Sequence, residues 1–393
     1  MTDNHFIPKI TALIPAAGYS SRMKGLFKPL LPLGGMTVLE RVIRLFQSVG
    51  VGDIRVIAGH RAADVMPLLN SSGICGIVNE NYPEGMFSSV LAGIRSMSRE
   101  IEAFFMLPTD IPLVRRSTVL NLLSAYRAGQ GNILYPVFDG MRGHPPLISA
   151  KYAEAIMLWK GQGGLRAFLE QHESSASDVE VADEGILSDM DTAEDYQIVL
   201  KRYEKYDIPT IRECKALMTK IFDVEEKIWL HCQEVARVAL CMGKALNAAA
   251  DPGLDLDLIA AASLLHDLAR KEPSHAAAGA RILENMGYSA VAELVKTHID
   301  IHIREDEPIQ ESEILYIADK LVQGDRVVSI EERFSEKRNR FADKPEAKAA
   351  VESRFMNALK IRQRFESRTG KDLYAVLSAI EPEPGASATR QIP

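Results

Sequence analysis

Two sets of residues in this 393-residue chain have the types and spacing to act on phosphates. The first set lies in LIPAAGYSSRMKGLFK, where an apolar run ends in small residues that let the backbone approach a ligand closely. The serines that follow could cap a short helix whose free N–H groups favour an anion. Arg22 and Lys28 would then neutralise a nucleoside triphosphate. This hypothesis assigns nucleotide binding to Ala16, Ala17, Gly18, Ser20, Ser21, Arg22 and Lys28.

A carboxylate follows a second apolar run, FFMLPTD, at Asp110. Ligands of open α/β sheets bind beyond the carboxyl ends of the strands, and a carboxylate there can hold Mg²⁺ bridging substrate phosphates. In the alternative interpretation, Arg22 and Lys28 are solvated loop charges and Asp110 caps a turn before Pro112.

The segment SDMDTAED brings three more carboxylates together, Asp189, Asp191 and Asp195. They supply a second carboxylate to the phosphate site, or they cap the helix that is expected to begin near Thr192. The pattern alone leaves both interpretations open.

The second set lies in helical patterns of the C-terminal half. His231 falls on an apolar stripe, His266 and Asp267 end the apolar run LIAAASLLHD, and Asp319 lies on an apolar side. Polar groups directed into an apolar core are costly unless they are paired or bind a metal. A single such histidine is more often a satisfied core residue, but four converging groups favour a metal site.

Two kinds of fold must position these sets. In the first half, short strand-like runs alternate with helical patterns, which predicts a mostly parallel sheet covered by helices. Two strand runs around Asp139 and Gly140 predict a hairpin. The strand-like runs are residues 10–16, 53–59, 75–80 and 103–110, and the helical ones include 37–50, 61–73 and 88–100.

From Ile211 onward the strand signal disappears and helical segments follow one another. The predicted organisation is an α/β domain over residues 1–205, an all-α bundle over 206–380 and a disordered tail over 381–393. Helices after Val327 carry many charges at helical spacing, and we interpret them as solvated faces.

Composition and charge narrow the function. A net charge of −7 gives no footprint for nucleic acid. The four cysteines form no CxxC pair and are interpreted as reduced thiols of a cytoplasmic protein. The N-terminus lacks the apolar region of a secretory signal, and the most apolar helical run, residues 258–265, is too short to span a bilayer. We therefore expect neither a nucleic-acid nor a membrane partner.

The motifs of the first half occur in an informative order. PAAGYSSRM with a following lysine, NENYPEGMFSSVLAGI, PTDIPLV, RGHPPLI, GQGGLR and DMDT succeed one another over about residues 10–200. In this order they resemble the molybdenum cofactor cytidylyltransferases of the MobA-like nucleotidyltransferase group. PAAG is more similar to the cytidine-using branch, because the guanosine-using branch typically has Ala-Gly-Gly there.

This resemblance implies a Rossmann-like nucleotidyltransferase fold, dependence on Mg²⁺, and transfer of CMP from CTP to molybdopterin with release of pyrophosphate. It implies catalytic roles for Arg22, Lys28 and Asp110, with Asp110 and Asp191 as metal ligands. The family usually reads Arg-Met-Gly-x-x-Lys, whereas RMKGLFK has one residue more, so Lys24 and Lys28 are both candidates for the phosphate-binding lysine. The residues implied to line the substrate site are Asn81, Gly85, Ser88, Ser89, Gly143 and His144.

The order His231, His266-Asp267, Asp319 resembles the HD-domain metal-dependent phosphohydrolases over about residues 212–340. The resemblance implies a helical bundle with one or two divalent metals (Mn, Fe, Zn, Mg or Ni), these four residues as the primary ligands, and His266 and Asp267 as catalytic residues. Three further histidines resemble those of two-metal members, and the last two are one turn apart if their helix continues; the alternative is a solvated or supporting role. They are His275, His298 and His302.

Two cations after the HD pair, Arg270 and Lys271, could meet a substrate phosphate or be ordinary helix C-terminal cations. The combined hypothesis is a bifunctional enzyme whose partners are CTP, molybdopterin or molybdenum cofactor, and a molybdenum hydroxylase apoenzyme. Two alternatives remain: a nucleotidyltransferase for another acceptor, such as a sugar or polyol phosphate, and an HD half that is a nucleotide sensor or a docking module.

Overall fold

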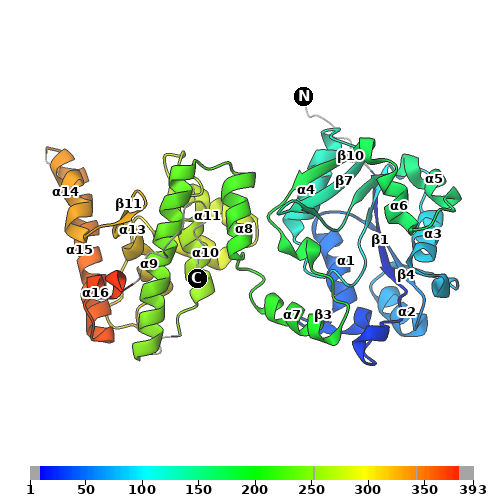
Figure 1. Ribbon diagram of the computed structural model, residues 1–393, viewed down its shortest axis with the longest axis horizontal. Coiled ribbons are helices and arrows are strands. Elements are labelled where there is room, and N and C mark those ends of the chain that lie inside the picture. Colours follow the sequence, from blue (N-terminus) through cyan, green and yellow to red (C-terminus); the bar gives the residue numbers. More distant parts are fainter. Residues whose placement is uncertain (1–8, 251–252, 342, 380–393) are drawn as a thin grey trace. The chain divides into compact units, whose positions relative to one another are not determined.

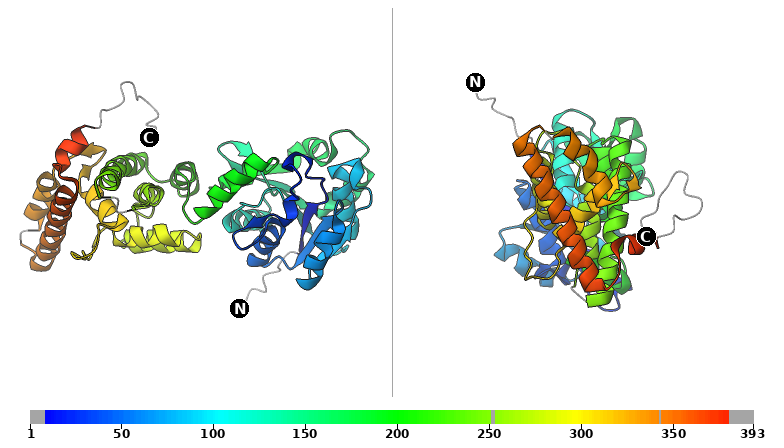
Figure 2. Two further views of the ribbon diagram at one scale, coloured as in Figure 1. Left: turned by 90° about the horizontal axis from the view of Figure 1, so that it is seen from below. Right: turned by 90° about the vertical axis from the view of Figure 1, so that its left-hand side faces the viewer.

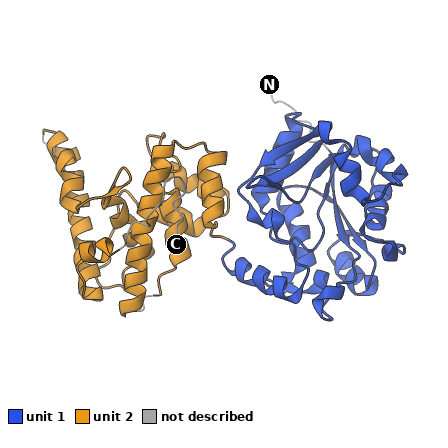
Figure 3. Ribbon diagram, viewed as in Figure 1, with its two compact units in different colours: residues 1–206 blue, residues 207–393 orange. Residues whose placement is uncertain are grey.

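The computed structural model describes residues 9–250, 253–341 and 343–379, and the chain divides into two compact units, residues 1–206 and 207–393 (Figure 3). The predicted tail, residues 381–393, lies outside the described residues. Each unit carries one of the two sets of candidate residues.

The first unit is built on a mostly parallel sheet with strand order β10-β7-β9-β6-β1-β4-β5, which confirms the α/β prediction (Figure 1). β9 is antiparallel to both of its neighbours, and the other pairings along this path are parallel. The strands are β1 (Ile10–Ala16), β4 (Asp53–Ala58), β5 (Cys75–Val78), β6 (Ala103–Met106), β7 (Ile133–Phe138), β9 (Leu147–Ser149) and β10 (Ala176–Glu180).

Helices cover both faces of this sheet (Figure 1). α1 packs with α4 on one face, and α3 packs with α5 and α6 on the other. A capping box between Thr37 and Glu40 starts α1. The helices are α1 (Val38–Ser48), α2 (Ala62–Ser71), α3 (Met86–Ser96), α4 (Arg116–Arg127), α5 (Ala153–Leu158), α6 (Gly164–Glu170) and α7 (Ala193–Glu204).

The path of the chain through the sheet creates the crevice in which ligands of such folds bind. From β1 the chain moves outward through β4 to β5, then returns to the other side of β1 as β6. The carboxyl ends of β1 and β6 therefore flank a switch point, where neighbouring connections leave toward opposite sides. The glycine-containing turn follows β1, and Asp110 follows β6.

Two local expectations in this unit are resolved. The hairpin at Asp139 and Gly140 is confirmed: both residues have positive φ, 55° and 76°, and β8 (Met141–Arg142) pairs antiparallel with β7. β1 continues through Ala16, so this predicted turn residue belongs to the strand.

The second unit is a helical bundle in which α9 contacts α10, α13 and α15 (Figures 1 and 2). A five-residue π-helical segment, Leu217–Ile221, follows α8. The helices are α8 (Ile211–Ala216), α9 (Glu226–Ala250), α10 (Leu256–Leu265), α11 (His275–Asn285), α12 (Ser289–Thr297), α13 (Glu311–Lys320), α14 (Ile330–Arg340), α15 (Pro345–Thr369) and α16 (Leu373–Ser378).

The bundle departs from the all-α expectation in one place. β11 (Val322–Gln323) and β12 (Arg326–Val327) form a small antiparallel hairpin around Gly324, whose φ is 64°. Two-residue strands carry too little periodicity to be recognised, although a Gly-Asp pair at 324–325 is a turn signal.

No helix in the described ranges is both long enough and apolar enough to cross a lipid bilayer. All four cysteines are free thiols, of which Cys214 and Cys232 are buried and Cys75 is exposed.

Candidate functional sites

The turn after β1 differs from the capped helix that its serines suggested. It contains a 3-10 turn, Ser21–Met23, and Ser20, which precedes this turn, has a left-handed φ of 52° and makes no side-chain capping hydrogen bond. The Ser20 hydroxyl instead accepts a hydrogen bond from the backbone N–H of Lys28 at 3.2 Å, which ties the two ends of the turn together. The serine-cap interpretation is therefore wrong, and Ser20 stabilises the loop.

The small residues of the turn are not equally accessible. Ala16 and Ala17 are buried, whereas Gly18 is exposed, and a Cβ built on Gly18 would meet nothing within 4 Å. Gly59 packs against Ala17 so closely that a Cβ there would lie 2.7 Å from the Ala17 Cβ. The surface open to a ligand therefore begins at Gly18.

Lys28 lies between two carboxylates from distant parts of the first unit. Its Nζ lies 3.2 Å from Asp110 Oδ2 and 2.7 Å from Asp191 Oδ1, and Arg22 Nη2 lies 2.8 Å from Asp191 Oδ2. The hydrogen bond from Lys28 and the nearby Arg22 lower the pKa of Asp191, although burial opposes the shift. The four predicted residues Arg22, Lys28, Asp110 and Asp191 thus come together in one ion-pair network.

The other candidate lysine, Lys24, points to a different partner. Its Nζ lies 2.6 Å from Glu194, and both side chains are largely exposed. The left-handed conformations of Lys24 and Gly25 accommodate the additional residue of the turn, so Lys28 occupies the position that faces Asp110.

Buried methionines explain why residues 169 positions apart meet. Met23 and Met190 are fully buried in one apolar cluster with Leu113, which places their neighbours Arg22 and Asp191 side by side. The Asp110 carbonyl also accepts a hydrogen bond from the Met190 N–H at 2.8 Å. The loops after β6 and before α7 are therefore held together by backbone as well as by side chains.

The carboxylates of SDMDTAED divide between the two predicted roles. Asp195 forms a capping box with Thr192 at the start of α7 and also accepts from the Asp191 N–H at 3.1 Å. Asp191 faces Lys28 and Arg22. Capping by Asp195 therefore positions the carboxylate of Asp191.

The residues expected around NENYPEGMFSS are organised by one that was not singled out, Asn79. Its side-chain amide donates to the hydroxyls of Ser88 at 2.9 Å and Ser89 at 3.0 Å, and its carbonyl accepts from the Asn81 N–H. Ser89 is buried, whereas Asn81 and Gly85 are exposed. Ser89 therefore shapes the start of α3 rather than presenting its hydroxyl to a ligand; an asparagine directly after β5 was the available signal.

A cavity of about 610 Å³ lies beside the turn and contains Gly143 and His144. Its wall is largely apolar, and a Cβ on Gly143 would come within 2.5 Å of the Ile186 carbonyl oxygen. Burial lowers the pKa of His144, while Asp110 and Asp189 oppose that shift. The apolar wall includes Met86, Phe87, Val90, Met106, Tyr135 and Leu165.

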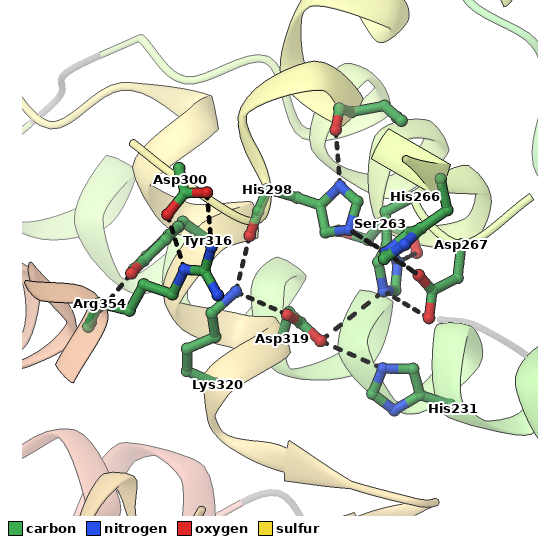
Figure 4. Close-up of polar contacts among 12 residues, drawn as sticks. His231, Ser263, His266, Asp267, His298, Asp300, Tyr316, Asp319, Lys320 and Arg354 are labelled. Carbon is green, nitrogen blue, oxygen red and sulfur yellow. Dashed lines mark hydrogen bonds and ion pairs between the residues drawn. The ribbon is translucent and has the colours of Figure 1, made fainter. Parts of the chain in front are cut away.

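In the second unit, the four predicted ligands converge from three helices and their ends (Figure 4). Asp319 Oδ1 lies 3.2 Å from His231 Nε2 and 3.8 Å from His266 Nε2. Asp267 Oδ2 lies 3.6 Å from His266 Nε2. Ligand atoms of His231, His266 and Asp267 all lie within 4.8 Å of one another, close enough for one metal ion.

A second group shares Asp267. Its other oxygen, Oδ1, lies 3.2 Å from His275 Nε2 and 3.8 Å from His298 Nε2, and the two histidine nitrogens are 3.3 Å apart. His302 does not join them, because α12 ends at Thr297 and its side chain is exposed. The condition under which His298 and His302 would lie one turn apart, a helix that continues past His298, is not met.

Hydrogen bonds to the backbone fix which histidine nitrogens can bind a metal. The Nδ1 atoms of His231, His266 and His298 lie 2.8, 2.8 and 2.6 Å from the carbonyl oxygens of Gly324, Ser263 and Val295. A carbonyl oxygen can only accept, so Nδ1 carries the proton and Nε2 keeps its lone pair. Figure 4 shows the His231 and His266 rings directed at the carboxylates.

The charge states suit cation binding. Burial lowers the pKa of His266 and, with His266 as neighbour, lowers that of His298 to about 3. Burial alone would raise the pKa of Asp267, but His266 and the hydrogen bond from His275 lower it below its ordinary value. The histidines His266 and His298 are therefore neutral and Asp267 is ionised at neutral pH.

One atom of the cluster, His266 Nε2, gives independent support for a divalent metal at this site. His266 Nε2 is buried and has no hydrogen-bond partner among the described residues, although it is aimed between two carboxylates. A buried lone pair without a donor is costly, and a metal ion would satisfy it. Imidazole and carboxylate ligands suit several divalent transition metals.

Cations near the cluster differ from the prediction. Arg270 lies 3.3 Å from Asp267 and lines a second cavity, which opens on the His/Asp cluster, whereas Lys271 lines two other surface depressions. Lys320, which was not singled out, donates to Asp319 Oδ2 at 2.8 Å and to the His298 carbonyl at 2.7 Å. Lys337, interpreted as part of a solvated face, lines the cavity as well.

Comparison with known proteins agrees with this division. Residues 12–176 match the MobA-like NTP transferase domain, and residues 228–323 match the HD domain. The chain thus carries a nucleotidyltransferase domain, which takes a nucleotide substrate, followed by an HD phosphohydrolase domain with a His/Asp cluster suited to divalent metal.

The relatives resemble the first half of the chain. The molybdenum cofactor cytidylyltransferase of Escherichia coli K12 is 27% identical over 195 residues, which are 49% of this chain and 97% of that protein. The nicotine blue oxidoreductase of Paenarthrobacter nicotinovorans is 29% identical over 194 residues, 48% of this chain and 95% of that protein. A solved nucleotidyl transferase from Methanothermobacter thermautotroptrophicus is 22% identical, with a TM-score of 0.44, covering 50% of this chain and 98% of that one.

Proposed function

We propose that the first domain is a CTP:molybdopterin cytidylyltransferase and the second a metal-dependent phosphohydrolase. The observation that carries the first assignment is the network in which Lys28 and Arg22 meet Asp110 and Asp191 at the sheet's switch point. Cations for a triphosphate and two oxygen ligands for a hard cation are thereby brought to one place.

The residues act by binding and orientation. Arg22 and Lys28 would exchange their carboxylate partners for the oxygens of CTP, neutralising charge that builds up as pyrophosphate leaves. An oxygen of the acceptor phosphate forms a bond to the α-phosphorus, and the bond from that phosphorus to the bridging oxygen breaks, with pyrophosphate keeping the electron pair. Asp110 and Asp191 would hold Mg²⁺, which when bound neutralises phosphate oxygens and orients them.

The cavity beside the turn supports a flat, partly apolar acceptor. Its wall of methionine, aromatic and aliphatic side chains suits a fused ring system, with His144 and Arg142 at hand for polar edges. The wall also carries polar side chains, among them Arg142, His144 and Glu170, so a sugar or polyol phosphate, which requires hydrogen-bonding groups around its hydroxyls, is the acceptor against which molybdopterin is tested. The similarity to the Escherichia coli enzyme supports the same acceptor.

The decisive test is pyrophosphate release from CTP and, separately, GTP with Mg²⁺ and molybdopterin cofactor as the acceptor. CTP-selective turnover is the expected result. Turnover only with a sugar or polyol phosphate as acceptor would contradict the assignment, and GTP preference would contradict the nucleotide.

For the second domain, the shared Asp267 and the fixed Nε2 atoms carry the proposal. Bound metal would lower the pKa of water and neutralise a phosphate ester. The chain's own contribution is a largely buried, pre-ordered ligand set, with Arg270 at the cavity wall to bind phosphate. Metal-dependent release of phosphate or CMP, lost in His266→Ala plus Asp267→Ala, is the test; metal binding without turnover on any nucleotide would favour a sensor.

Fusion of the two domains supports a shared pathway in a cytoplasmic protein, with a molybdenum hydroxylase apoenzyme as the recipient of the product. Pull-down of the full chain with such an apoenzyme, in the presence and absence of CTP, tests this partner. Binding that needs neither nucleotide nor cofactor would instead favour a docking role for the helical half.

A further inference from the structure

The cavity of about 480 Å³ that opens on the His/Asp cluster carries far more positive than negative charge. Besides three histidines, its wall includes only two carboxylates, Asp267 and Asp319. An excess of cationic side chains around a concave site favours a polyanion. The cations in the wall are Lys227, Arg270, Lys320, Arg333, Lys337 and Arg354.

Four of these six cations already have carboxylate partners. The pairs are Lys227–Glu225 at 2.8 Å, Arg270–Asp267 at 3.3 Å, Lys320–Asp319 at 2.8 Å and Arg354–Asp300 at 2.6 Å. Within the described part of the chain, Arg333 and Lys337 have no such ion pair. The charge available to a ligand is therefore concentrated on these two side chains.

Both side chains project from one face of α14, because residues four apart share a helix face. Like charges at this spacing destabilise a helix unless an anion compensates them. The Arg333 Nε is buried and has no hydrogen-bond partner among the described residues, which is costly for a charged group. Partial burial and Arg333 lower the pKa of Lys337 to about 8.

We infer that Arg333 and Lys337 bind the second phosphate of a substrate whose first phosphate lies at the His/Asp cluster. This inference rests on the proposed phosphohydrolase function and adds the substrate class: a compound with at least two linked phosphates, free or nucleotide-linked. A phosphate monoester would leave both α14 cations without a partner. The subsite lies outside residues 228–323, which match the HD domain, so it belongs to the segment that follows them.

The experiment uses isothermal titration calorimetry on the full, manganese-loaded chain and compares two ligands. One is imidodiphosphate, whose P–N–P bridge resists the hydrolysis that would cleave the P–O–P bridge of diphosphate, and the other is inorganic phosphate. Arg333→Ala and Lys337→Ala are each expected to weaken imidodiphosphate binding about tenfold or more. Phosphate binding should change less than about twofold, because that ligand needs only the His/Asp cluster.

Arg340→Ala is the matched control. It removes a cation from the same helix, but Arg340 lies against the Phe341 ring and is absent from the cavity wall. Its affinity for imidodiphosphate should equal that of the parent. Lys337 is buried only in part and keeps much of its surface exposed, so its variant tests the inference even if Arg333→Ala unfolds.

A third ligand, adenosine 5′-(β,γ-imido)triphosphate, distinguishes a nucleotide-linked diphosphate from a free one. Tighter binding than imidodiphosphate that Lys337→Ala weakens assigns the α14 subsite to a nucleotide, because binding that this variant leaves unchanged belongs to the transferase domain. Equal or weaker binding at the subsite assigns it to free diphosphate. Equal losses for phosphate and imidodiphosphate, or no loss in either variant, would overturn the inference. Since binding of these ligands does not require turnover, a chain that binds them without hydrolysing any phosphate would contradict only the proposed function.

Discussion

The two sites differ in how their charged side chains are held before a ligand binds. In the helical domain, the candidate metal ligands His266, Asp267 and His298 are buried, and backbone carbonyls fix the histidine rings. In the transferase domain, Arg22 and Lys28 lie in short 3-10 turns, Asp191 lies in a loop, and the Arg22 side chain is 68% exposed. Burial and backbone hydrogen bonds hold the side chains of the first site, whereas ion pairs between its own side chains hold the second.

This difference has an energetic consequence. An ion pair with exposed members contributes only about 0–1 kcal/mol, so exchange of the carboxylates for a nucleotide at Arg22 costs little. In the helical domain, Asp267 and the lone pair of His266 Nε2 have been taken out of water. Metal should therefore stabilise the folded helical domain strongly, by about 2.7 kcal/mol at a hundredfold excess over Kd, whereas Mg²⁺ alone should hardly affect the transferase domain.

The largest effect should come from Asp267→Asn, which keeps the shape but removes the charge shared by both metal groups. We expect metal affinity and phosphohydrolase activity to fall more than about 100-fold, since even residues that only support ligands contribute 10- to 100-fold. Metal content by mass spectrometry and thermal unfolding with and without metal measure this. Cytidylyltransferase activity should be unchanged; retention of metal-induced stabilisation would show that Asp267 is no ligand.

The corresponding change in the other site is Asp110→Asn, for which we expect a loss of about 100-fold in CTP turnover with folding intact. Steady-state pyrophosphate release as a function of Mg²⁺ concentration measures it. Asp139→Asn is the matched control, because it makes the same change on an exposed turn of the same domain whose positive φ asparagine also tolerates. A variant that loses no activity at saturating Mg²⁺ would place the metal elsewhere.

The sequence predicted the helical site better than the loop site for a physical reason. Helical periodicity fixes the face on which His231 and Asp319 lie, so an apolar stripe carrying a polar residue already points into the core. The packing of α9, α10 and α13 then brings these residues next to His266 and Asp267. His302 does not join the other histidines, and periodicity could not indicate this because it does not show that α12 ends at Thr297.

Loop positions depend on contacts that periodicity cannot indicate. The role of Ser20 follows from the path of the backbone to Lys28, and Asn79 is recognised only once α3 is packed against its amide. Arg333 and Lys337 had the spacing of an exposed helix face, which is indistinguishable in sequence from a face turned to a charged cavity. Residue order predicted the overall fold, and tertiary contacts determined these details.

Loss of a residue that only positions the candidate metal ligands should lower metal affinity less than loss of a ligand itself. Lys320→Met removes the bonds from Nζ to Asp319 and to the His298 carbonyl, so metal affinity should fall about 10- to 100-fold. Competition with a chelator measures the affinity. Lys296→Met, on exposed α12 surface beside Glu293, is the control. An unchanged metal affinity would mean that packing alone positions Asp319.

The smallest effect should be a pH dependence that the transferase site does not share. Lys337 faces Arg333 on its own helix, Asp319 and Lys320 on α13, and Arg270 after α10, and these surroundings with burial give it a pKa of about 8. Below that pH it is a cation, and above it the charge is lost, so imidodiphosphate affinity should fall about fivefold from pH 7 to pH 9. The arginine of Lys337→Arg keeps its charge throughout this range. The affinity of this variant for imidodiphosphate should therefore not show the fall between pH 7 and pH 9 that the parent shows. The same fall in both proteins would assign the pH dependence to the ligand or to the cluster, and the two sites would then not differ in this respect.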